Sequence, residues 1–107
     1  MYKVAHYVTA SGEDCFQDYL DQMRDTQARI RILRRIDRAQ MGNFGDHRVN
    51  ISDGVSELRI DVGKGYRVYY TLFRGEMLLL LLCAGDKSTQ PSDIDQAVRF
   101  RREYLAR

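Results

Sequence analysis

The run MLLLLLCA at residues 77–84 constrains the fold of this chain more than any other stretch. Its apolar residues follow one another without the alternation of a strand that has one face in water, so both faces should be covered. The run is also far shorter than the ~20 apolar residues that a membrane-spanning helix needs. It therefore predicts a central strand, with helices on one side of the sheet and other structure on the opposite side.

Turn residues divide the rest of the chain into further strand-like segments. Residues 2–9 alternate loosely and predict a first strand. Residues 47–51, 55–62 and 65–73 predict three more, which are separated by short loops rich in glycine and precede the leucine run.

Three helices are predicted from apolar spacing and capping residues. Ser11 is the expected N-cap of a first helix that has Phe16, Tyr19, Leu20 and Met23 at helical spacing. A second helix is expected from Asp25 to Met41, with Ile32, Leu33 and Ile36 on its buried side and Gly42 after its end. Pro91 and a capping box from Ser92 to Asp95 predict a last helix over residues 91–105.

This order of elements predicts an α+β fold: a curved, mostly antiparallel sheet packed by an N-terminal helical hairpin, with a C-terminal helix. The 107 residues are enough for one domain of ordinary size, so residues 1–107 are expected to form a single domain.

Several classes of protein are disfavoured. No basic and apolar leader opens the chain, so a cytoplasmic protein without a membrane segment is expected. Cys15 and Cys83 are predicted to be buried thiols, not a disulfide, and His6 and His47 are too far apart in sequence to indicate a metal site. No cofactor is expected. AGDKSTQ at 84–90 lacks the glycines of a phosphate-binding loop, because Asp86 and Leu81 stand at their positions.

Arginine is concentrated in two segments, although the net charge is only +2. Residues 24–38 hold six arginines against Asp25 and Asp37, and residues 99–107 hold four against Glu103. A solvated helix surface with ion pairs along the helix explains this pattern, and so does a polyanionic partner, since the guanidinium fork grips phosphate with two prongs. Under the second interpretation Arg34 and Arg38 are candidate RNA-binding residues.

A second arginine pair lies in SELRIDVGKGYRVYY, residues 56–70. If Gly63–Gly65 is a three-residue hairpin loop, Val62 faces Tyr66 and Arg59 faces Tyr69. Side-chain alternation then puts one set of residues on an exposed polar face, with Lys64 at its edge. That set is Glu57, Arg59, Asp61, Arg67, Tyr69 and Thr71. Its acids either neutralise the arginines or hold them in position for a phosphate.

The stretches GVSELRIDVGKGYRVYY and LLLCAGDKSTQPSDIDQA closely resemble the RelE/ParE superfamily of toxins from bacterial toxin–antitoxin modules. The nearest group is the HigB-like addiction module killer proteins. RIRILRRIDRAQMGNFGD fits as well, so the resemblance covers almost the whole chain; Ala84 stands where glycine is common. The resemblance implies a RelE-like sheet packed by two N-terminal helices.

The resemblance also implies a function. Similar toxins cleave mRNA in the ribosomal A site without a metal, and a small helix-turn-helix antitoxin silences them. This chain is thus expected to be an mRNA interferase whose partners are a cognate antitoxin, the ribosome and mRNA. The family's arginines correspond to Arg59 and Arg67, and its lysine to Lys87. The candidate catalytic residues are Arg59, Lys64, Arg67, Tyr69 and Lys87; the candidate RNA-binding residues are Arg34, Arg38, Arg59, Lys64, Arg67 and Lys87.

Cleavage by a 2′-hydroxyl needs a base and an acid, and arginine stays protonated. Proton transfer then falls to Lys64, Lys87, Tyr69 or Asp86, with help from His47, and a lysine base needs a lowered pKa. Two other interpretations remain: a ParE-like protein that inhibits DNA gyrase by binding alone, and an inactive or antitoxin-dependent DNA-binding module.

Overall fold

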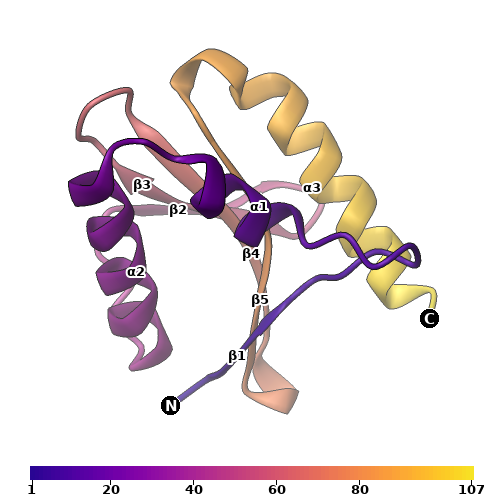
Figure 1. The fold of residues 1–107 in the computed structure, drawn as a ribbon. Coiled ribbons are helices and arrows are strands. Elements are labelled where there is room, and N and C mark those ends of the chain that lie inside the picture. The colour runs from indigo at the N-terminus through magenta and orange to yellow at the C-terminus, as the bar shows by residue number, and fades with distance from the viewer.

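Five strands and three helices make up the computed structural model, which describes all 107 residues (Figure 1). The strands are β1 (Lys3–His6), β2 (His47–Ser52), β3 (Val55–Ile60), β4 (Tyr66–Phe73) and β5 (Leu78–Asp86). The helices are α1 (Cys15–Gln22), α2 (Thr26–Gln40) and α3 (Gln90–Leu105), with short 3-10 turns at Arg74–Glu76 and Lys87–Thr89.

The strands form one mixed sheet in the order β1-β5-β4-β3-β2, in which only the pair of β1 and β5 is parallel. The predicted α+β class and the C-terminal helix are confirmed. The first strand is shorter than predicted, since it ends at His6 and not at residue 9.

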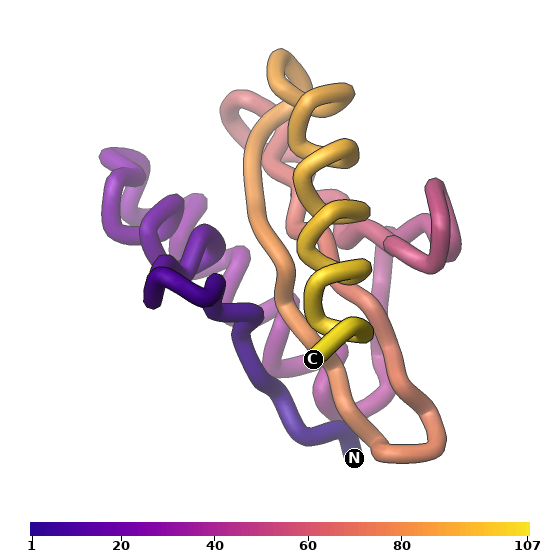
Figure 2. The backbone as a smooth tube through the Cα atoms, turned by 90° about the vertical axis from the view of Figure 1, so that its right-hand side faces the viewer, coloured from indigo at the N-terminus to yellow at the C-terminus, as the bar shows by residue number.

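β5 contains the leucine run and lies between β1 and β4, so the prediction of a central strand is correct. Both of its faces are covered. Side chains from α1 and α2 pack on one face of the sheet, and those of α3 pack on the other. Figure 2 shows β5, in orange, between the N-terminal helices and α3. The structure on the second face, which the sequence left undefined, is therefore α3.

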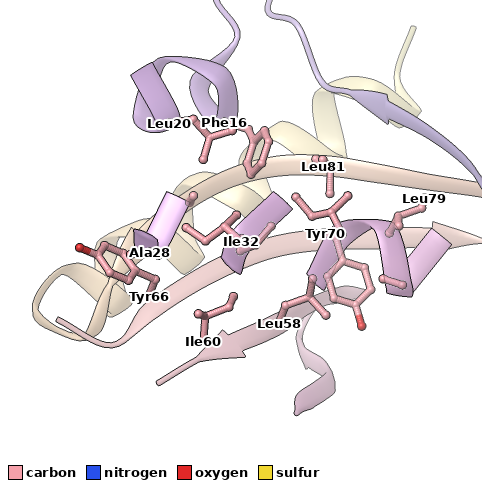
Figure 3. Packing of buried hydrophobic residues seen from close by; sticks show 14 residues of the cluster. Phe16, Leu20, Ala28, Ile32, Leu58, Ile60, Tyr66, Tyr70, Leu79 and Leu81 are labelled. Carbon is pink, nitrogen blue, oxygen red and sulfur yellow. The ribbon is translucent and has the colours of Figure 1, made fainter. Parts of the chain in front are cut away.

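The core beneath α1 and α2 is drawn in Figure 3. Phe16 and Leu20 of α1 and Ile32 of α2 pack against the sheet at Leu58 and Leu81, and all five side chains are at most 3% exposed. Leu33 was expected on this buried side, but it is 45% exposed. It lies about 100° around the helix from Ile32, outside the stripe that faces the sheet.

The starts of α1 and α3 differ from the predictions. Asp14, and not Ser11, caps α1, because its carboxylate accepts the Gln17 amide hydrogen at 3.0 Å. The capping box lies at Asp86 and Thr89 in the turn before α3, and not at Ser92–Asp95. The Ser92 hydroxyl instead donates to the Thr89 carbonyl at 3.0 Å. Pro91 lies in the first turn of α3 as expected.

The hairpin of β3 and β4 has a different register from the predicted one. Ile60 faces Tyr66 and Arg59 faces Arg67, so the loop spans five residues, 61–65, instead of three. Two turn hydrogen bonds close it: the Val62 amide to the Ile60 carbonyl and the Gly65 amide to the Val62 carbonyl, both 2.9 Å. The register differs by two residues, so every side chain keeps the face that alternation predicts.

Candidate functional site

Four arginines of α2 line a groove along the free edge of β3. Their spacing puts them on one side of the helix, and Arg59 of β3 completes the basic lining. We call this the arginine groove; its volume is about 420 Å³. It is lined by Arg31, Arg34, Arg35, Arg38, Asp46, Arg59, Ile60, Asp61 and Val62.

The groove exists because β2 covers only part of β3. The pairing of these strands begins where His47 faces Leu58, so the β3 edge beyond Leu58 has no neighbouring strand. Arg35 compensates there by donating to three main-chain carbonyls: Arg59 at 2.6 Å, Phe44 at 2.9 Å and Asp46 at 2.7 Å. Arg35 therefore connects α2 to the loop before β2 and to the β3 edge. The partial burial of its side chain lowers its pKa.

The other three α2 arginines of the groove are free to bind a ligand. The side chains of Arg31, Arg34 and Arg38 are exposed and make no hydrogen bond or ion pair with the protein. The Arg59 side chain is 36% exposed, and its Nη1 lies 4.0 Å from Asp46 Oδ1. The groove therefore presents several unsatisfied guanidinium groups, which suit a chain of phosphates.

Arg67 does not lie on an exposed face, so the prediction of an exposed polar face is wrong for this residue. Its side chain is only 4% exposed. Nη1 donates to Asp61 Oδ1 and to the Tyr66 carbonyl, both at 2.9 Å, and Nε lies 3.9 Å from Glu57 Oε2 without a hydrogen bond. A guanidinium held in this way and only 4% exposed offers little surface to a substrate phosphate.

α3 causes this burial by packing over the strand face that bears Arg67. Glu57 is 1% exposed and accepts a hydrogen bond from Gln90 Nε2 of α3 at 2.8 Å. Tyr69 is fully buried, and its hydroxyl makes no hydrogen bond. Burial, followed by the charge of Glu57, raises the pKa of Tyr69. Tyr69 is therefore inaccessible to RNA and unsuited to proton transfer.

The two candidate lysines are exposed but lie outside the groove. Lys64 lines a second cleft on the other side of the 61–65 loop. The Lys87 side chain passes over Gly65, where a Cβ would come within 2.7 Å of its Cε, and it lines a shallow pocket beside Glu57 and Gln90.

The remaining proton-transfer candidates are also engaged by local structure. His47 Nδ1 lies 2.7 Å from the Gly45 carbonyl. Asp86 accepts hydrogen bonds from the Ser88 hydroxyl at 2.5 Å and from the Ser88 amide at 2.8 Å. These bonds hold the pKa of Asp86 below its usual range.

The structure thus divides the predicted site. It brings together Arg34, Arg38 and Arg59, buries Arg67 and Tyr69, and places Lys64 and Lys87 on neighbouring loops. Sequence reasoning missed Arg31 and Arg35, although their spacing from Arg34 and Arg38 contained the signal.

No metal or membrane site is visible. No three His, Cys, Asp or Glu side chains lie together in a way that can hold a metal ion. None of the helices has the length and apolar character to span a bilayer. Cys15 and Cys83 are free thiols; the first donates to Gln96 Oε1 at 3.6 Å and the second to the Asp93 carbonyl at 3.5 Å.

Comparison with known proteins gives one informative relative. No family model matches the chain, and no solved structure matches it significantly. An uncharacterized protein of Haemophilus influenzae is 48% identical over 88 residues, which cover 82% of this chain and 87% of that protein. The chain therefore belongs to the same family as this Haemophilus influenzae protein.

Proposed function

We propose that this protein is the toxin of a toxin–antitoxin module, with a RelE-like fold and an N-terminal helical hairpin, and that it acts in the cytoplasm as a ribosome-dependent mRNA endonuclease. The observation that carries the proposal is the arginine groove. Arg31, Arg34 and Arg38 have no partner in the protein, and Arg59 has only a distant one. A groove with unpaired guanidinium groups is the arrangement that binds a polyanionic backbone.

The groove also contains groups that can take part in phosphate chemistry. In the proposed reaction the 2′-hydroxyl attacks the adjacent phosphorus, a 2′,3′-cyclic phosphate forms, and the bond to the 5′ oxygen breaks. Arg59 stabilises the charge that builds on the phosphate. The carboxylates of Asp46 and Asp61 line the same groove and can accept the hydroxyl proton. Lys64 and Lys87, on neighbouring loops outside the groove, are the candidate donors to the 5′ oxygen. Arg67 acts as a positioning residue through Asp61.

The test is primer extension on a message translated by purified ribosomes in the presence of the protein. The double variant Arg34→Ala/Arg38→Ala should lose cleavage, while Arg74→Ala/Arg99→Ala, with the same change of charge on exposed arginines elsewhere, should cut like wild type. RNA binding by the groove variant should also show a weaker salt dependence, by ~0.7 in log–log slope for each lost phosphate contact. Message that stays intact with the wild-type protein contradicts the endonuclease proposal.

One observation favours a second candidate, a ParE-like inhibitor of DNA gyrase that binds without cutting. The groove lining contains no histidine, lysine or tyrosine, so the usual proton-transfer side chains other than carboxylates are absent from it. This function predicts intact mRNA and an induced DNA-damage response upon expression. The two candidates are separated by whether the message is cut.

The proposed partner is a helix-turn-helix antitoxin that covers the arginine groove and hides its charge from RNA. A neighbouring reading frame should encode it. Harmless expression of this protein alone, with no such frame beside its gene, contradicts the toxin proposal.

A further inference from the structure

A second concave site lies beside the arginine groove, on the other side of the 61–65 loop. We call it the tyrosine cleft; its volume is about 520 Å³, within the ~300 to 1,000 Å³ of ordinary small-molecule sites. Val62 lines the groove, and the next residue, Gly63, lines the cleft. Its lining includes Tyr19, Arg24, Asp25, Lys64, Tyr66 and Asp86.

The groove and the cleft share one basic track. Arg24, in the link between α1 and α2, lines the cleft, and Arg31 of α2 lines the groove. Lys64 adds a second exposed cation at the cleft. A single-stranded RNA whose phosphates bind along the arginine groove toward the start of α2 therefore reaches the tyrosine cleft.

The half-buried Tyr19 supplies aromatic surface for a base, and Tyr66, which is 5% exposed, supports its ring. The rings of Tyr19 and Tyr66 meet edge to face, with centroids 6.5 Å apart. Neither hydroxyl forms a hydrogen bond within the protein. Burial, and next the charge of Asp86, raises the pKa of Tyr19 to about 12, so its hydroxyl remains a donor near neutral pH. Single-stranded RNA is commonly read by such aromatic surfaces together with polar groups at the base edge.

Two carboxylates give the cleft its acceptors. Asp25 uses Oδ1 to cap α2 through the Ala28 amide at 3.0 Å, and Oδ2 faces Gly63. Asp86 uses Oδ1 for both bonds to Ser88, which leaves its other oxygen free. Ionised carboxylates accept hydrogen bonds and cannot donate them, so they favour a base with an exocyclic amino group.

We propose that the tyrosine cleft binds one unstacked nucleobase with an exocyclic amino group, cytosine, adenine or guanine, from a single-stranded RNA whose backbone lies in the arginine groove. Uracil presents a carbonyl where cytosine has its amino group. Two hydrogen-bond acceptors, the carbonyl and a carboxylate, would then face each other. The inference rests on the proposed RNA binding and adds a sequence preference to it.

The test compares two labelled RNA hexamers by fluorescence anisotropy at one salt concentration. One is hexauridylate, and the other carries a single cytidine at its third position. Wild-type protein should bind the cytidine hexamer about tenfold more tightly, as a good pair of base contacts gives. Asp25→Ser keeps the cap of α2 but withdraws the free carboxylate oxygen from the cleft, so it should reduce this preference to less than about twofold.

Two further variants separate the cleft from the groove. Tyr19→Phe should weaken binding of the cytidine hexamer, while Tyr104→Phe, a half-buried tyrosine on α3, should not. The groove variant Arg34→Ala/Arg38→Ala should weaken both hexamers equally and keep their ratio. Equal binding of the two hexamers by wild-type protein overturns the cleft inference and leaves RNA binding intact. Failure to bind either hexamer overturns both.

Discussion

Arg67 Nη1 lies 2.9 Å from Asp61 Oδ1, although the Arg67 side chain is 4% exposed and the Asp61 side chain is 45% exposed. The pair joins the buried layer beneath α3 to the wall of the arginine groove, because Asp61 also lines that groove. On the buried side, Glu57 Oε2 lies 3.9 Å from Arg67 Nε. Arg67 therefore holds a groove residue in place from inside the protein.

Arg67→Ala should destabilise the fold strongly, since it leaves the Glu57 carboxylate buried without its cation. The expected loss is ~3 to 5 kcal/mol in free energy of unfolding. Urea unfolding measures it. Arg74→Ala, at an exposed turn, should change the same quantity by less than about 0.5 kcal/mol. A wild-type unfolding midpoint for Arg67→Ala contradicts the buried placement.

Asp61→Asn should make stability less dependent on acid pH. The hydrogen bond from Arg67 lowers the pKa of Asp61, so its ionised form stabilises the folded state. This contribution is present above the unfolded pKa of about 3.9 and is lost as the pH falls through the lower folded value. The variant should thus be less stable than wild type near neutral pH, and this difference should shrink as the pH falls below about 3.9. Urea midpoints in the two pH ranges check this, with Asp37→Asn as an exposed control that shows no such difference.

Tyr69→Phe should leave both folding and RNA cleavage intact. The variant removes a buried hydroxyl that has no hydrogen bond, so the free energy of unfolding should stay within about 1 kcal/mol of wild type or rise. Thermal melting and primer extension measure the two properties. A large loss of cleavage in a stable protein would return Tyr69 to the catalytic residues.

Gly85→Ala should loosen the contact between β5 and α3. A Cβ at residue 85 would overlap the Asp93 carboxylate and lie 2.9 Å from Thr89 Oγ1. Asp93 accepts a hydrogen bond from Thr89 there, and burial raises its pKa. The expected loss of stability is ~1 to 3 kcal/mol by urea unfolding. Gly75→Ala has open space around its Cβ and serves as the control; equal midpoints for the two variants contradict the close approach.

The sequence determined the elements and their faces through local periodicity. The unbroken apolar run at 77–84 predicted a strand covered on both faces, and β5 is that strand. Alternation assigned Leu58, Val68 and Tyr70 to the core face of the hairpin, and they lie in the cluster beneath α1 and α2. Helical spacing contained the α2 arginine stripe. These features depend on residues close in the chain, where the period of the backbone fixes the side-chain direction.

Only the tertiary structure decided what each face meets. Hydrogen bonds within the 61–65 loop set the register that places Arg59 opposite Arg67, and a shift of two residues leaves no trace in the alternation. α3 begins more than twenty residues after Arg67 and buries it. The short pairing of β2 with β3 leaves Arg59 beside the arginines of α2. Whether an arginine is buried or free depends on packing between distant segments, which local periodicity does not encode.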